Sequence, residues 1–225
     1  MREIILDTET TGLDALNGDR LVEIGCVETI NHVATGRHYH VYINPERDMP
    51  AEAEAVHGLS ATFLADKPIF AAVVGDFLDF IADSPLVIHN ATFDMGFLNA
   101  ELARLGMPKL TNPVTDTVKI ARRRFPGAAA SLDALCRRFE IDNSNRTLHG
   151  ALLDAELLAE VYLELMGGRQ PDLVLGAGQS IQVEVQQTVI SRPVRPARPH
   201  APTAEELAAH EAFIKGMKAP LWLAE

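Results

Sequence analysis

The run Glu3-Ile4-Ile5-Leu6-Asp7-Thr8-Glu9-Thr10-Thr11-Gly12 decides how the first part of the chain folds. Its apolar residues predict a short buried strand that ends in two acids, two residues apart. Because side chains alternate across a strand, Asp7 and Glu9 are expected to point to the same face. Two neighbouring carboxylates repel each other unless a cation lies between them. Small residues follow the pair and leave space above it, which favours a metal site over a solvated surface pair.

Strand and helix patterns alternate through residues 1–167. Further strands are expected at 21–27, 38–43 and 85–88, and helices at 69–82, 93–105, 116–124, 131–138 and 150–166. Three early strands followed by helices that alternate with strands predict an α/β fold with a mixed sheet covered by helices.

Composition narrows the class of protein. The 225 residues are 47% hydrophobic, which is typical of one globular domain with an appendage. With no run of eighteen apolar residues and no signal-peptide pattern, we expect a soluble cytoplasmic chain without a membrane segment. Cys26 and Cys136 are far apart and are expected to be buried, reduced thiols.

The charge is distributed unevenly. The net charge is −11, and residues 1–170 hold 25 acids against 15 lysines and arginines. A basic face for duplex DNA is therefore not expected. The surplus acids in this part of the chain could instead gather around cations. Arg122-Arg123-Arg124 is the local basic run, and it is either a phosphate contact or a solvated helix end.

The composition changes after Gly168. Residues 176–203 are rich in Gln, Pro, Ala and Arg, and prolines recur every third residue from Pro193 to Pro202. This spacing fits either a polyproline II spacer or a disordered linker. A capping box at Thr203 then predicts a short helix ending at Gly216. A short helix and a tail containing Trp222 cannot bury themselves alone, which is typical of a docking peptide.

Two further acids and a histidine follow strands or precede helices. Asp94 lies in the first helical turn after the 85–88 strand, where it either caps the helix or joins a site at the strand ends. His149 and Asp154 would diverge by about 140° on one continuous helix. They can act together only if His149 lies in a loop before the helix, which Gly150 permits. Asp154 falls near the apolar stripe and therefore needs a metal or a donor.

Together these residues fit metal-dependent hydrolysis. Carboxylate oxygens suit Mg²⁺ or Mn²⁺ better than Zn²⁺. Two such ions, about 4 Å apart, activate a water and stabilise the leaving oxygen in phosphodiester cleavage. A nearby neutral histidine can accept the proton of that water.

Five stretches of the sequence resemble a known family. They are Leu6-Asp7-Thr8-Glu9-Thr10-Thr11-Gly12, Val56-His57-Gly58-Leu59, Val87-Ile88-His89-Asn90-Ala91-Thr92-Phe93-Asp94, Ser131-Leu132-Asp133-Ala134-Leu135-Cys136 and Leu148-His149-Gly150-Ala151-Leu152-Leu153-Asp154-Ala155. Their order resembles the DEDDh 3′–5′ exonucleases and, in detail, the epsilon proofreading subunits of bacterial DNA polymerase III. The resemblance covers residues 2–168 and returns at 205–211. It implies a ribonuclease H-like mixed five-stranded sheet flanked by helices, plus a flexible C-terminal tail.

The resemblance also implies a role for each matching residue. His149 would be the general base, and Asp7, Glu9, Asp94 and Asp154 would hold two divalent cations, Mg²⁺ or Mn²⁺. The residues implied to bind the terminal nucleotide are Asp7, Glu9, Thr10, Thr11, Leu13, Glu52, His57, Asn90, Phe93 and Asp154. For His57 alone, packing within its loop is the alternative.

The same resemblance implies partners. Residues 1–168 would form the exonuclease domain, 169–202 a linker and 203–225 a tail that docks on the polymerase alpha subunit through Trp222. Gln170, Leu173 and Leu175 resemble a motif that binds the sliding clamp. The sequence leaves open whether a small third core subunit also binds the exonuclease domain. The substrate would be a single-stranded or frayed DNA 3′ end, delivered by the polymerase. The alternatives are a ribonuclease T-like RNA 3′-end exonuclease and a non-catalytic adaptor between clamp and polymerase.

Overall fold

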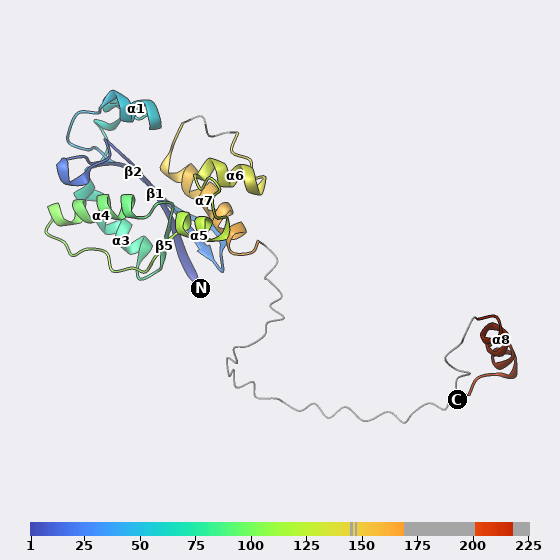
Figure 1. The fold of residues 1–225 in the computed structure, drawn as a ribbon. Helices are drawn as coiled ribbons and strands as arrows, with labels where there is room; N and C mark the ends of the chain where they lie inside the picture. The colour runs from blue at the N-terminus through green and yellow to red at the C-terminus, as the bar shows by residue number, and fades with distance from the viewer. Residues whose placement is uncertain (145, 147, 169–200, 218–225) are drawn as a thin grey trace, which may run out of the picture. The chain divides into compact units, whose positions relative to one another are not determined.

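Strand β1 (Arg2–Thr10) lies at the centre of a five-stranded mixed sheet (Figure 1). The computed structural model describes residues 1–144, 146, 148–168 and 201–217. The other strands are β2 (Leu21–Ile30), β3 (Val33–Tyr42), β4 (Leu86–Ile88) and β5 (Val114–Asp116), and the order is β3-β2-β1-β4-β5. The β1, β2 and β3 strands are antiparallel, whereas β4 and β5 run parallel to β1. The predicted mixed five-stranded sheet is therefore confirmed.

Helices cover both faces of the sheet: α3 (Phe70–Ile81) and α4 (Thr92–Arg104) lie on one face, and α5 (Thr117–Arg124), α6 (Leu132–Phe139) and α7 (Ala151–Leu165) lie on the other. The chain also forms the helices α1 (Ala51–His57) and α2 (Ala61–Leu64) and a short 3₁₀ turn η1 (Ala15–Asn17). Ile4 and Leu6 of β1 face α3 and α4, whereas Ile5 faces α5, α6 and α7. Figure 1 shows the two helical layers on either side of the strands. The alternation within β1 thus supplies both cores.

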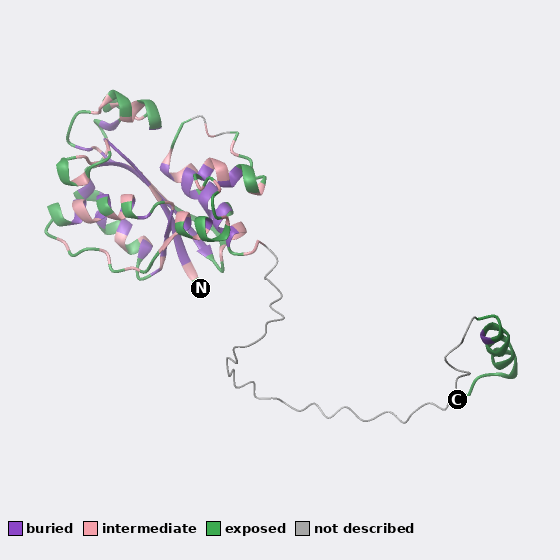
Figure 2. Cartoon of the chain, viewed as in Figure 1, coloured by how far each residue is buried: buried purple, intermediate pink, exposed green. Residues whose placement is uncertain are grey.

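The buried residues follow the central strands and one helix. Figure 2 shows them along β1, β2 and α7, while α1 is largely exposed. Cys26 on β2 and Cys136 on α6 are buried and free, as expected. No helix within the described residues combines the length and the apolar character needed to cross a bilayer.

The sequence pattern missed several short elements. It did not predict β5, α1 or α2, and β2 and β3 are longer than expected because they form a hairpin that reaches Ile30 and Val33. The last helix of residues 1–168 begins at Ala151 with Gly150 as its N-cap. This start places His149 in the preceding loop, as the sequence required.

Helix α8 (Ala204–Lys215) forms separately near the C-terminus. The side chain of Thr203 accepts from the backbone N–H of Glu206, and the Glu206 carboxylate accepts from the backbone N–H of Thr203. The predicted capping box and the helix end at Gly216 are therefore confirmed. The sequence predictions for the linker and for Gln170, Leu173, Leu175 and Trp222 lie outside the described residues.

Candidate active site

Strand β2 and helix α7 meet at a glycine, Gly25. Asp7 and Glu9 lie on the face of β1 that faces α7, and Asp7 pairs in register with Gly25 of β2. A Cβ atom on Gly25 would lie 2.3 Å from the backbone of Ala151. Because glycine lacks this atom, the first turn of α7 packs directly on β2. This contact brings Asp154 beside the two acids of β1.

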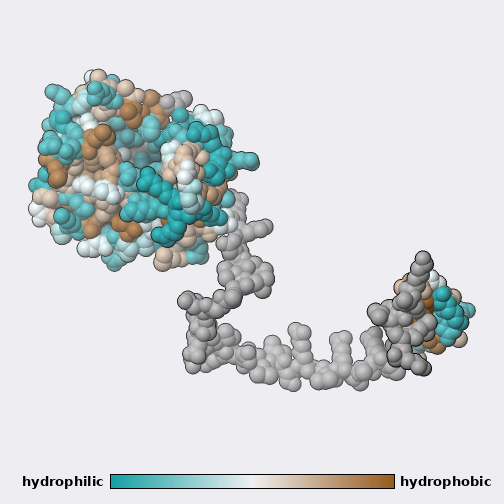
Figure 3. All heavy atoms as spheres, in the orientation of Figure 1, coloured by the Kyte–Doolittle hydropathy of each residue, from teal (hydrophilic) through white to brown (hydrophobic). Residues whose placement is uncertain are grey.

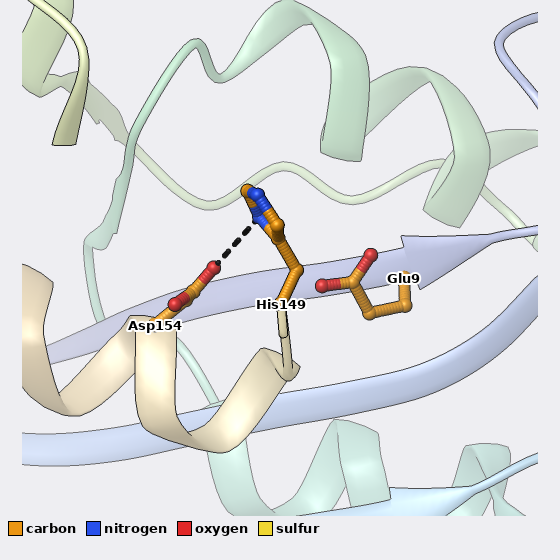
Figure 4. A group of neighbouring side chains, drawn as sticks. All are labelled: Glu9, His149 and Asp154. Carbon is orange, nitrogen blue, oxygen red and sulfur yellow. Dashed lines mark ion pairs between the residues drawn. The ribbon is translucent and has the colours of Figure 1, made fainter. Parts of the chain in front are cut away.

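The loop before α7 positions His149 over the same acids. The backbone N–H of His149 donates to the carbonyl of Val56 in α1 (3.1 Å), and that of Asp154 donates to Gly150 (2.8 Å). Figure 4 shows His149 and Asp154 on one side and Glu9 on the other. Each offers one ligand atom, and these three atoms lie within 4.8 Å of one another.

Asp94 joins the site from the other side of β1. It lies in the first turn of α4, only 2% exposed, and the hydroxyl of Thr8 donates to its Oδ1 atom (2.7 Å). A cavity of about 420 Å³ lies among all five residues that the sequence selected: Asp7, Glu9, Asp94, His149 and Asp154. The structure thus brings together side chains that are up to 147 positions apart in the sequence.

Burial and mutual repulsion raise the pKa values of the acids in this cavity. Burial raises the pKa of Glu9 to about 8, with further contributions from Glu23 and Asp154. Burial also raises the pKa of Asp94 to about 7, although the hydrogen bond from Thr8 opposes this change. The pKa of Asp7 lies well above its ordinary value because of burial and the charges of its neighbours. The cluster therefore holds more negative charge than it can retain without a cation.

Arg146 supplies positive charge to this cluster. Within the described residues, it is the only arginine or lysine that lines the cavity, and its side chain is 8% exposed. Its Nε and Nη2 atoms donate to the two carboxylate oxygens of Asp154, with Nη2 at 2.7 Å from Oδ2. Nη1 donates to Asp133 (2.7 Å), and Nη2 also lies 2.7 Å from Nδ1 of His149.

The residues present fit divalent cations. Glu9, His149 and Asp154 can offer ligand atoms to one ion, and Asp7 and Asp94 add carboxylates to the same cavity. The raised pKa values of the acids show that a cation would stabilise them in their charged form. An oxygen-rich donor set of this kind suits hard ions.

A second cavity of about 370 Å³ adjoins the first, and both are lined by Glu9, Leu13 and Phe93. The predicted nucleotide-binding residues are distributed between them: Thr10, Thr11, Glu52 and His57 line the second, and Asn90 lines the first. His57 is 5% exposed, its Nδ1 accepts from the backbone of Leu59, and its buried Nε2 has no hydrogen-bond partner among the described residues. Because Nδ1 accepts, Nε2 carries the proton, so a donor is available for a ligand here.

One predicted nucleotide contact has its hydroxyl engaged elsewhere. The Oγ1 atom of Thr11 accepts from the backbone of Arg20 (3.0 Å) and lies 3.4 Å from Asp19. The residue is 1% exposed, so it fixes the turn after β1. Leu13, by contrast, is 86% exposed beside the cavities and is free to contact a base.

Three titratable residues that line the first cavity were not predicted as site residues from the sequence. They are His89, Asp133 and Arg146. His89 and Asp133 lie within stretches that carry the family resemblance, which was the available signal. Arg146 lies outside those stretches, and no pattern in the sequence points to it.

The arginines of the basic run in α5, Arg122 to Arg124, fall into two environments. Arg124 donates to the carbonyls of Glu164 and Leu165, so it caps the end of α7. Arg122 and Arg123 are exposed, and Figure 3 shows hydrophilic side chains gathered over α5. The run thus combines a structural cap with a solvated helix face.

Comparisons with known proteins agree with this geometry. The family model described as "Exonuclease" matches residues 4–162. DNA polymerase III subunit epsilon of Rickettsia prowazekii is 54% identical over 95% of this chain and 96% of the relative. The protein of the same name from Escherichia coli K12 is 48% identical over 95% of this chain and 92% of its own length.

Solved structures show the same architecture. Exonuclease X in complex with 5′ overhanging duplex DNA is similar with a TM-score of 0.59 and 28% identity, over 72% of this chain and 90% of that one. The nuclease domain of 3′hExo, a DEDDh family member bound to rAMP, has a TM-score of 0.65 over 73% of this chain and 91% of its own. At 15% identity this second likeness shows the fold. The chain is therefore a 3′–5′ exonuclease that belongs to the exonuclease family and, within it, to the DNA polymerase III epsilon subunits.

Proposed function

We propose that this chain removes mismatched nucleotides from DNA 3′ ends, using two divalent cations held by Asp7, Glu9, Asp94 and Asp154. The observation that carries the proposal is the convergence of these acids and His149 on one cavity. Asp7, Glu9 and Asp154 would hold the first ion, with Asp7 shared by the second and Asp94 supporting the second. Mg²⁺ and Mn²⁺ are the ions that this set of oxygens suits.

The side chains around the ions have separate tasks. When bound, the ions neutralise the phosphodiester and lower the pKa of an attacking water. His149 stands beside Asp154, 49% exposed, and accepts the proton of that water at a ring nitrogen. Release of the terminal residue as a nucleoside 5′-monophosphate follows from attack on its phosphorus.

The second cavity is suited to the terminal nucleotide. Its walls include the exposed Leu13 and the partly buried Phe93, which can contact a base, and Glu52 and His57, which can contact a sugar hydroxyl. The imidazole Nε2–H of His57 gains a partner in this arrangement. Only the 3′ end of a DNA strand would enter such a site. Binding of a strand end does not need a large basic face, which is consistent with a protein that is acidic overall.

The partners would compensate for weak DNA affinity. A polymerase that holds both the nuclease and the primer raises the effective concentration of the 3′ end. We assign the alpha subunit to residues 203–225 and the sliding clamp to Gln170, Leu173 and Leu175, in the cytoplasmic replisome; a small third core subunit is a further candidate. Removal of 203–225 should abolish alpha binding in a pull-down and leave nuclease activity intact, whereas equal binding would reject this assignment.

A nuclease assay tests the proposed activity. The full chain with added Mn²⁺ should shorten a mismatched DNA 3′ end one nucleotide at a time, faster than a short RNA, and a chelator should stop it. Asp7→Ala with Glu9→Ala should lose orders of magnitude of activity. Asp76→Ala with Asp79→Ala, which removes two exposed acids from α3, should not. Preference for RNA would favour the ribonuclease T-like alternative, and an inert protein would favour the adaptor.

A further inference from the structure

Arg146 binds the carboxylate of Asp154, which is one of the ligands that the proposed metal site needs. Its guanidinium contacts both oxygens of Asp154 at once, and its third nitrogen binds Asp133. The side chain is 8% exposed, so these charges are paired largely out of water. A paired, buried guanidinium is held far more firmly than an exposed one.

The same guanidinium fixes the tautomer of the neutral His149 ring. Nη2 of Arg146 lies 2.7 Å from Nδ1 of the imidazole, and an arginine nitrogen can only donate. Nδ1 is therefore an acceptor, and the proton of the neutral ring is on Nε2. Nδ1 also lies 3.3 Å from Oδ2 of Asp154, but both atoms accept from Nη2, so this approach is not a hydrogen bond between them. In this arrangement the imidazole has no free lone pair for a water.

A divalent cation and Arg146 cannot both be well placed at Asp154. Either the guanidinium leaves at least one of the two oxygens, or the ion binds beside a positive charge and is repelled by it. In both cases Arg146 weakens metal binding at this carboxylate. If it leaves, the lone pair of His149 becomes available at the same moment.

We propose that Arg146 is an internal cation that stabilises the metal-free acids and blocks His149, and that a divalent cation displaces it from Asp154. The inference rests on the proposed metal site and goes beyond it. Arg146 then acts as a positioning residue, because it sets when Asp154 and His149 are available. Metal binding and the availability of the general base are coupled through this one side chain.

The direct test measures how tightly Mn²⁺ binds to the full, EDTA-treated chain without DNA. The electron paramagnetic resonance signal of free Mn²⁺ reports how much of the ion stays unbound. Arg146→Met keeps much of the aliphatic stem and removes the charge, so it should bind Mn²⁺ at least about tenfold more tightly than wild type. Arg146→Lys should fall between the two. The control is Arg20→Met, because Arg20 forms a similar bidentate ion pair with Glu101, outside this cavity. It should leave Mn²⁺ affinity unchanged.

Thermal unfolding separates displacement from a general loss of stability. Arg146→Met should lower the melting temperature in EDTA more than in saturating Mn²⁺, whereas Arg20→Met should lower both equally. Equal or weaker Mn²⁺ binding by Arg146→Met would overturn the inference while leaving the metal site in place. A wild-type chain that binds no Mn²⁺ would overturn both.

A measurement on the wild-type chain does not depend on the folding of a variant. The ¹⁵N–¹H signal of the Arg146 Nε–H, assigned by its absence from Arg146→Lys, should be protected without metal because Asp154 holds it. Saturating Mg²⁺ should shift it and expose it to exchange with water. A signal that stays protected at saturating Mg²⁺ would contradict displacement.

Discussion

Gly25 lies against the backbone of Ala151, so closely that a Cβ atom on the glycine would be 2.3 Å from it. This contact sets the distance between β2 and the first turn of α7, and therefore the place of Asp154. Gly25→Ala should push α7 away from the sheet, lowering stability by about 2 kcal/mol. Activity should fall about 100-fold through misplacement of Asp154.

The matched control for this glycine lies in α3. Gly75 is exposed, and a Cβ atom there would meet nothing within 4 Å. Gly75→Ala should raise stability by about 0.5–1 kcal/mol and leave activity unchanged. Urea unfolding and nuclease rates measured on both variants check the pair; a Gly25→Ala variant with normal activity would refute the role of the close contact.

The hydroxyl of Thr8 stabilises the charged form of Asp94. Burial raises the pKa of this acid to about 7, and the 2.7 Å hydrogen bond from Thr8 opposes that rise. Thr8→Val should therefore raise that pKa, and the pH at which Mn²⁺ half-saturates the protein should rise by about one unit. Thr29→Val, which removes a buried hydroxyl bonded to a backbone carbonyl elsewhere in the sheet, should not change that pH. An identical pH dependence in both variants would argue against the role of Thr8.

Stability without metal should fall as the pH rises. In the folded protein the pKa of Glu9 is about 8 and that of Asp94 about 7, whereas their ordinary values are 4.5 and 3.8. Between about pH 4 and pH 8 the folded state keeps protons that the unfolded chain has released. The free energy of unfolding in EDTA should then drop by several kcal/mol across this range, which lowers the melting temperature by about 10 °C or more.

Mn²⁺ should reverse this trend, because the ion binds the deprotonated acids and stabilises the fold more at high pH. Scanning calorimetry from pH 5 to pH 8.5, with EDTA and with Mn²⁺, measures both curves. Asp7→Ala with Glu9→Ala should flatten the EDTA curve. A wild-type melting temperature that rises with pH in EDTA would show that the acids are not held protonated by burial.

His149 can be tested by restoring its function with hydroxide. His149→Ala should reduce activity at neutral pH by about 100-fold or more, because the water loses its proton acceptor. The loss should shrink at higher pH, where hydroxide replaces the base. His38→Ala, an exposed histidine on β3, serves as the control and should behave as wild type throughout. Full activity of His149→Ala at neutral pH would remove this residue from the reaction.

Much of the fold followed from local patterns. Ile4, Ile5 and Leu6 alternate between the two cores as a central strand requires, and the same alternation placed Asp7 and Glu9 on one face. The bend before α7 was predictable because two residues five positions apart can meet only across a helix start. The short elements β5 and α1 were not predictable, since three or seven residues carry too little periodicity to be recognised.

Only part of the site could be predicted from the sequence. The acids could be identified because repulsion between them demands a cation, whatever the fold. Arg146 could not, because its pairing with Asp133 and Asp154 depends on the path of a loop that no periodicity describes. The turn that occupies the Thr11 hydroxyl is equally a property of the folded chain.

The proposed activity depends on divalent ions held among Asp7, Glu9, Asp94 and Asp154. Anomalous diffraction from crystals of the full chain soaked in Mn²⁺ tests this claim most directly. The predicted result is strong anomalous density about 2.1 Å from carboxylate oxygens of Glu9 and Asp154, with Arg146 turned away from Asp154. Density at other acids, or a cavity without any peak and with Arg146 still in place, would contradict the account.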